Sequence, residues 1–210
     1  MKLIDMSVKD FINTLASDAV APGGGSVSAL AGANGSGLIE MAGALTVNKK
    51  KFKELDEDTQ NNFITLIKFF KDSKDRFLTY IDEDTDAFNQ LMDAFRMPKM
   101  SDVEKEERSL AIQLATIGTI KVPLEVCRLA VESLRKVETV MTYANKNTIS
   151  DQGVGVMMLA NAAEGSAMNV LINLSGLNDQ DEADNYRLIV QQILEEVRTI
   201  KTTLLDKIKL

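Results

Sequence analysis

Residues 54–96 constrain the fold more than any other part of the chain, because they form one long stretch without proline or glycine. Apolar side chains recur along it at the three- and four-residue spacing of a single helix face. They are Phe63, Ile67, Phe70, Phe77, Ile81, Phe88, Leu91 and Phe95. The pattern predicts one continuous helix that ends at Met97-Pro98, since the residue before a proline avoids helical backbone.

The rest of the chain repeats this helical pattern with short breaks. N-caps, periodicity and terminating residues predict further helices at about 7–18, 26–47, 101–121, 123–143, 150–174 and 179–208. Ser101 and Glu104 have the spacing of a capping box, and Pro123 either kinks a continuous helix or begins a new one. We find no β alternation, internal repeat or linker, so residues 1–210 are predicted to form an all-α, antiparallel, single-domain bundle.

The composition excludes several classes of site. The chain has no histidine and one cysteine, Cys127, so an intramolecular disulfide and a multi-cysteine zinc site are impossible. The commonest metal ligand is missing, and we expect no metal. A net charge of −7 argues against nucleic acid as a partner, because phosphate binding requires a basic face. Any catalysis is therefore expected to use carboxylates, amines, hydroxyls, amides or backbone groups.

The expected location is the cytoplasm. Residues 1–5 lack the charged region and apolar stretch of a signal peptide. Residues 26–47 have about the length of a membrane crossing. Their glycines, serines and Glu40 dilute the hydrophobicity, so a helix of small residues packed in a soluble core is predicted, and no membrane partner.

Asp84 falls on the apolar stripe of residues 54–96, three residues after Ile81 and four before Phe88. Asp82 and Asp86 are rotated roughly 160–200° from it, at ~100° per residue, and are predicted to face solvent. A buried carboxyl has a raised pKa, which a general acid near neutral pH requires. Either Asp84 has this role, or it is a structural residue satisfied by a lysine or a backbone group.

The Gly23-Gly24-Gly25-Ser26 turn leads directly into a predicted helix. Free N–H groups and the positive end of the helix dipole suit an anion there, and glycine lets a flat ligand approach the backbone. A plain tight turn is the alternative. No Gly-Lys-Ser/Thr follows, so the turn is not a Walker loop.

Two other polar sets are candidate binding residues. Asn169 and Asn173 lie one turn apart among apolar neighbours and need partners, which are either a heterocycle or another helix. The basic run Lys49–Lys53 either binds a carboxylate tail or forms a solvated surface.

In the order and spacing of several segments, the sequence resembles the formiminotransferase-cyclodeaminase C-terminal domain family, which includes stand-alone methenyltetrahydrofolate cyclohydrolases. The segments are 22–26, 49–52, 82–88, 98–99, 122–124, 150–155 and 169–174. The resemblance implies an all-α homo-oligomer, with a dimer favoured, that acts on one-carbon units carried by tetrahydrofolate. It implies no cofactor beyond this folate substrate, a place in histidine degradation, and a functional link to a formimidoyltransferase.

The resemblance also assigns roles to residues. The family's proton-donating aspartate falls on Asp84, and Asn48 and Ala144 depart from glycines that are common in the family. Substrate-binding roles are implied for Gly23, Gly24, Gly25, Ser26, Lys49, Lys50, Lys99, Asn147, Asp151, Asn169 and Asn173.

The implied reaction closes 5-formimidoyltetrahydrofolate to 5,10-methenyltetrahydrofolate with release of ammonia. Hydrolysis of the methenyl bridge to 10-formyltetrahydrofolate is the first alternative. A non-catalytic helical assembly protein is the second, and it predicts that Asp84 makes only a structural hydrogen bond.

Overall fold

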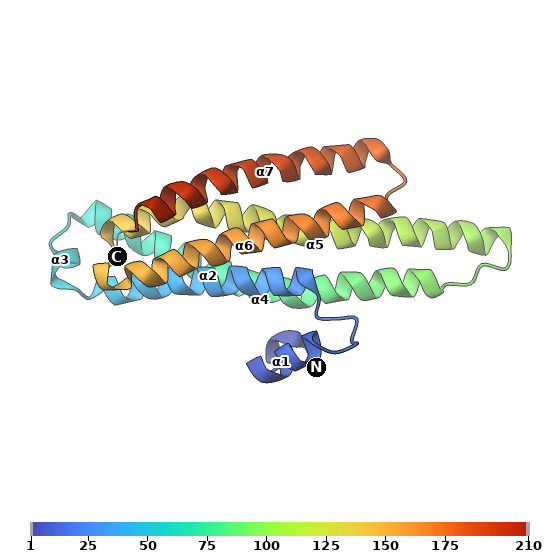
Figure 1. Cartoon of the computed structure of the whole chain (residues 1–210), viewed down its shortest axis with the longest axis horizontal. Helices are drawn as coiled ribbons and strands as arrows, with labels where there is room; N and C mark the ends of the chain where they lie inside the picture. Colours follow the sequence, from blue (N-terminus) through green and yellow to red (C-terminus); the bar gives the residue numbers. More distant parts are fainter. Residues whose placement is uncertain (1, 209–210) are drawn as a thin grey trace.

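A computed structural model describes residues 2–208, which form a bundle of long helices without a β-strand in that range. The long helices lie side by side along one axis (Figure 1). They are α2 (Gly24–Val47), α4 (Glu57–Arg96), α5 (Asp102–Tyr143), α6 (Ile149–Asn173) and α7 (Gln180–Asp206). The shorter elements are α1 (Val8–Leu15), α3 (Lys50–Lys53) and 3-10 turns at Leu3–Asp5, Lys146–Thr148 and Leu174–Gly176. The predicted all-α antiparallel bundle is confirmed.

Local capping explains where the two longest helices begin. The Asp56 side chain accepts the Thr59 N–H and starts α4. At α5, Ser101 and Glu104 form the predicted capping box. Pro123 lies inside a continuous α5, which settles the alternative of two separate helices.

Several predicted helix ends were wrong by a few residues, including the start of α4 at Glu57 rather than 54 and the end of α7 at Asp206 rather than 208. Helix α2 begins at Gly24 with Gly23 as N-cap, because the Ser26 hydroxyl bonds to Asp84 instead of capping the helix. Helix α6 begins at Ile149, directly after the 3-10 turn, rather than at Ser150 or Asp151. Helix α1 ends at Leu15 and not near Asp18.

The small residues of α2 allow close packing between α4 and α6. The Phe77 ring of α4 lies over Gly32, where a Cβ would come within 2.6 Å of the ring. Ile67 of α4 occupies the space over Gly43 in the same way. A side chain at either position would force the helices apart, so the composition of residues 26–47 reflects packing in the bundle.

The apolar stripe of α4 is buried only where α2 covers it. Phe63, Phe70 and Phe77 are almost fully buried, whereas Phe95 is 46% exposed. The ends of α4 and α5 extend beyond the start of α2 (Figure 1). The predicted apolar face of α4 is therefore buried along most of its length and exposed at its C-terminal end.

Asp82 does not face solvent as predicted. Its side chain is partly buried, and Oδ1 accepts the Leu3 N–H at 2.7 Å. The 3-10 turn Leu3–Asp5 covers this side of α4. Asp86 is exposed, as predicted.

Helix α5 contains an 18-residue window with a mean hydropathy of 1.4, long and apolar enough to cross a membrane. In the structure α5 packs against α4, α6 and α7. Ile120 and Leu124 of this helix are almost fully buried in the bundle, whereas Leu110 and Leu114 are more than 60% exposed.

Candidate active site

Asp84 of α4 faces the first turn of α2. The Ser26 hydroxyl donates to Asp84 Oδ2 at 3.0 Å, and Ser26 Oγ lies 3.4 Å from Thr85 Oγ1. Gly25 makes this approach possible, because a Cβ at that position would lie 2.1 Å from Asp84 Oδ1. The glycine turn and the aspartate thus form one structural unit.

A cavity of about 240 Å³ opens beside this unit, where α2, α4, α5 and α6 meet. Its lining combines small residues, hydroxyls, carboxamides and one aromatic ring. The residues are Val20, Ala21, Gly23, Gly24, Gly25, Asp84, Thr85, Phe88, Thr119, Asn169 and Asn173. The lining therefore includes six of the predicted site residues together with their supporting neighbours.

Burial raises the pKa of the Asp84 carboxyl, and hydrogen bonds from the Ser26 hydroxyl and backbone N–H partly oppose this rise. No lysine or arginine lines the cavity. Among residues 2–208 no ion pair reaches Asp84, so it is not the lysine-paired structural aspartate considered above. A carboxyl in this setting keeps its proton to higher pH than an ordinary aspartate and can give it to a base in the cavity.

The two carboxamides on α6 are held by backbone carbonyls. Asn169 Nδ2 donates to Gly165 O at 2.8 Å, and Asn173 Nδ2 donates to Thr119 O at 2.8 Å. The Asn169 amide also lies against Gly24, where a Cβ would be 3.3 Å from Nδ2. These bonds fix both side chains, so their second N–H and their Oδ1 atoms can serve a ligand with both acceptors and donors.

The remaining predicted binding residues lie elsewhere in the chain. Lys49 and Lys50 follow the C-terminal end of α2, a helix of 24 residues that spans about 36 Å. Asn147 and Asp151 belong to the same end of the bundle, at the α5–α6 turn. Lys99 lies in the loop after α4, beyond the other side of the cavity.

Sequence reasoning missed Val20, Ala21, Thr85, Phe88 and Thr119 as cavity residues. Thr85 and Phe88 had a usable signal, because they lie within one turn of Asp84. Thr119 had none, since only the packing of α5 against α6 brings it to the cavity.

Comparisons with known proteins identify relatives of this chain. The sequence profile of the formiminotransferase-cyclodeaminase family matches residues 7–207. A methenyltetrahydrofolate cyclohydrolase from Methylorubrum extorquens is 32% identical over 97% of this chain and 96% of its own. Formimidoyltransferase-cyclodeaminases from Gallus gallus and Dictyostelium discoideum are 30% and 34% identical, and the chain spans only 36% and 35% of their lengths.

A solved structure supports the fold independently. The formiminotetrahydrofolate cyclodeaminase from Thermotoga maritima superposes with a TM-score of 0.83, over 97% of this chain and 96% of that one, at 22% identity. The profile match over residues 7–207 and the end-to-end similarity to the Methylorubrum extorquens relative lead to one conclusion: the chain belongs to the formiminotransferase-cyclodeaminase family.

Proposed function

We propose that the chain is an enzyme that acts on the one-carbon unit of tetrahydrofolate, and that Asp84 protonates the nitrogen that leaves the one-carbon atom. One observation carries this proposal. A carboxyl with a raised pKa lies in a small cavity at a glycine-rich helix N-terminus. The relatives' names supply the substrate class, and the cavity supplies the proton donor.

The first candidate reaction is cyclisation of 5-formimidoyltetrahydrofolate. N10 attacks the formimidoyl carbon, the C–N bond to the departing nitrogen breaks, and that nitrogen takes a proton from Asp84 and leaves as ammonia. N10 gives its own proton to the same nitrogen, so the imino group gains the two hydrogens that ammonia requires as the 5,10-methenyl bridge forms. Ring closure is mainly a matter of positioning, which the fixed Asn169 and Asn173 carboxamides would provide.

Ser26 has a defined part in this step. Once Asp84 has given up its proton, the Ser26 hydroxyl and N–H stabilise the carboxylate that remains. The positive end of the α2 dipole acts in the same direction. The same groups that limit the rise of the pKa thus assist proton release.

The second candidate is methenyltetrahydrofolate cyclohydrolase, favoured by the end-to-end match to the Methylorubrum extorquens relative. Here water adds to the methenyl carbon, and Asp84 would protonate N5 as the bridge opens to 10-formyltetrahydrofolate. Both reactions require a proton donor at a nitrogen of the same folate, so one cavity serves either.

Three lysines outside the cavity are candidates for binding the tail of the substrate. Lys49, Lys50 and Lys99 are proposed to bind the glutamate carboxylates of the substrate, which an acidic protein would otherwise repel. Because α2 spans about 36 Å, Lys49 and Lys50 lie too far from Asp84 to meet the single glutamate of a folate whose ring is held there in the same subunit. For such a folate, binding by these lysines, and by Asn147 and Asp151, requires a homo-oligomer. The dimer, the cytoplasmic location and the absence of a further cofactor remain predictions.

The deciding experiment supplies purified protein with 5-formimidoyltetrahydrofolate and follows methenyl absorbance and ammonia together. Equal appearance of both establishes cyclodeaminase activity. Without turnover, accelerated loss of 5,10-methenyltetrahydrofolate establishes the cyclohydrolase instead. A protein that is inert in both assays contradicts the proposal and supports the non-catalytic alternative.

A further inference from the structure

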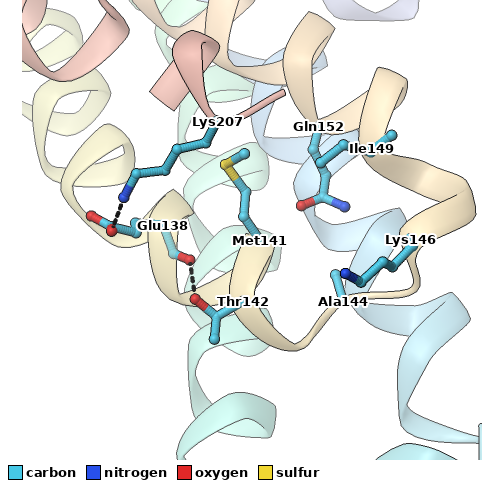
Figure 2. Close-up of a pocket in the computed structure, with 8 residues that line it drawn as sticks. All are labelled: Glu138, Met141, Thr142, Ala144, Lys146, Ile149, Gln152 and Lys207. Atoms are coloured by element: carbon cyan, nitrogen blue, oxygen red, sulfur yellow. Dashed lines mark hydrogen bonds and ion pairs between the residues drawn. The ribbon is translucent and has the colours of Figure 1, made fainter. Parts of the chain in front are cut away.

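A second cavity, of about 470 Å³, lies at the end of the bundle away from Asp84, and Figure 2 shows the residues that line it. The end of α5, the α5–α6 turn, the start of α6 and the residue after α7 line it. The lining residues are Glu138, Met141, Thr142, Ala144, Lys146, Ile149, Gln152 and Lys207. None of them lines the Asp84 cavity, and Gln152 lies about 25 Å along α6 from Asn169.

Gln152 brings an unpaired acceptor to this cavity. Its side chain is 1% exposed, Nε2 donates to Thr148 Oγ1 at 2.9 Å, and Oε1 has no hydrogen-bond partner among the described residues. The Thr148 hydroxyl already donates to Asn145 O at 2.6 Å, so its oxygen can only accept. This fixes the amide orientation, because a flipped Gln152 would place two acceptors together. A donor from outside the protein can satisfy Oε1.

The charges around the cavity leave one cation free. Lys207 pairs with Glu138, whereas Lys146 makes no ion pair with any residue in 2–208. Figure 2 shows Lys207 turned toward Glu138 and Lys146 extending below the Gln152 amide. The lining thus carries one excess positive charge in a protein of net charge −7. Met141, Ala144 and Ile149 supply an apolar wall between the charged and amide groups.

From these three features we infer that the cavity binds a small carboxylate with an apolar body and a hydroxyl or N–H group at its far end. The carboxylate pairs with Lys146, the body contacts Met141 and Ile149, and the donor bonds to Gln152 Oε1. A cavity of this volume accommodates a small molecule of that kind.

Calorimetric titration of the full chain with three related probes tests each contact. The probe 4-hydroxybenzoate has all three features, 4-methylbenzoate lacks the donor, and 4-hydroxybenzamide lacks the charge. We expect saturable binding of 4-hydroxybenzoate, with a preference of roughly tenfold over each of the others, as for one added hydrogen bond or ion contact. Absence of saturable binding by all three probes would overturn the inference.

Variants then assign the contacts. Gln152→Leu should remove the preference for the hydroxyl, and Lys146→Gln the preference for the charge. Lys105→Gln makes the same charge change near the opposite end of α5, some 50 Å away, and should change neither. Gln152→Met replaces Gln152→Leu if the latter does not fold. Retention of the hydroxyl preference in the Gln152 variant, or loss of binding in Asp84→Asn, would show that the probe binds elsewhere.

Discussion

Asp82 and Asp84 lie two residues apart on α4, yet opposite sides of the helix give the same carboxyl group different surroundings. Asp82 faces the N-terminal turn and accepts the backbone N–H of Leu3. Asp84 faces the cavity, accepts from Ser26, and has a pKa raised by burial. The comparison shows that chemistry on a helix depends on which neighbour each face meets, and not on the local density of acidic residues.

The largest expected effect is on turnover, and it distinguishes the roles of Asp84 and Asp82 directly. Asp84→Asn should lower kcat by roughly 10²–10⁴-fold, the contribution of a general acid, because the amide cannot give up a proton. Steady-state assays on the active folate substrate measure this change, and 5-formyltetrahydrofolate serves as a binding probe that should retain its affinity. Asp82→Asn is the matched control on the same helix and should keep near-normal turnover. Equal losses of kcat in both variants would contradict a special catalytic role for Asp84.

A methyl group at Gly25 should displace the Asp84 carboxyl and leave the surroundings of Asp82 unchanged. In Gly25→Ala the new Cβ would lie 2.1 Å from Asp84 Oδ1, so the carboxyl must move. A displacement of about 1 Å at a reacting group can cost ~10²-fold in rate. Gly37→Ala is the control on α2, because its Cβ meets only Lys74 Cδ at 3.8 Å. Circular dichroism should show folded protein for both, and normal activity of Gly25→Ala would argue against a fixed carboxyl.

The pH profile of Ser26→Ala should sharpen the comparison further. A general acid works while protonated, so kcat should fall as pH rises through the pKa of Asp84. Hydrogen bonds from Ser26 favour the ionised carboxyl. Removing the hydroxyl raises the pKa further, and the falling limb of the profile should move to higher pH. A limb that stays in place, or moves to lower pH, would contradict Asp84 as the acid.

The smallest expected effect belongs to Asp82 and concerns stability rather than turnover. Asp82→Ala removes the acceptor for the Leu3 N–H and should lower the free energy of unfolding by about 1 kcal/mol. Thermal unfolding monitored by circular dichroism measures the change, and Asp86→Ala provides an exposed control with little effect. A large loss of activity with unchanged stability would reverse the assignment of the two aspartates.

Periodicity alone predicted the orientation of Asp84, because the surrounding apolar residues repeat at helical spacing over several turns. The same argument failed for Asp82, whose partner Leu3 lies 79 positions away and leaves no local pattern. The glycine turn was predicted as a possible ligand site, but its contact with Asp84 depends on how α2 packs on α4. For Lys49 the family resemblance implied a role at the same site as Asp84, but the length of α2 separates the two residues within a subunit.

The glycines of α2 also determine how the helix is aligned lengthwise with α4. Gly25, Gly32 and Gly43 receive Asp84, Phe77 and Ile67 respectively, so successive steps of seven and eleven residues along α2 match steps of seven and ten residues backward along α4. These three contacts together fix the lengthwise position of α2 on α4. A shift of even one residue, about 1.5 Å, would bring the α4 side chains into the α2 backbone. The axial position of the reactive carboxyl is therefore set partly at Gly43, some 27 Å from Gly25 along the helix. The position of the Asp84 carboxyl therefore depends on residues far from the cavity.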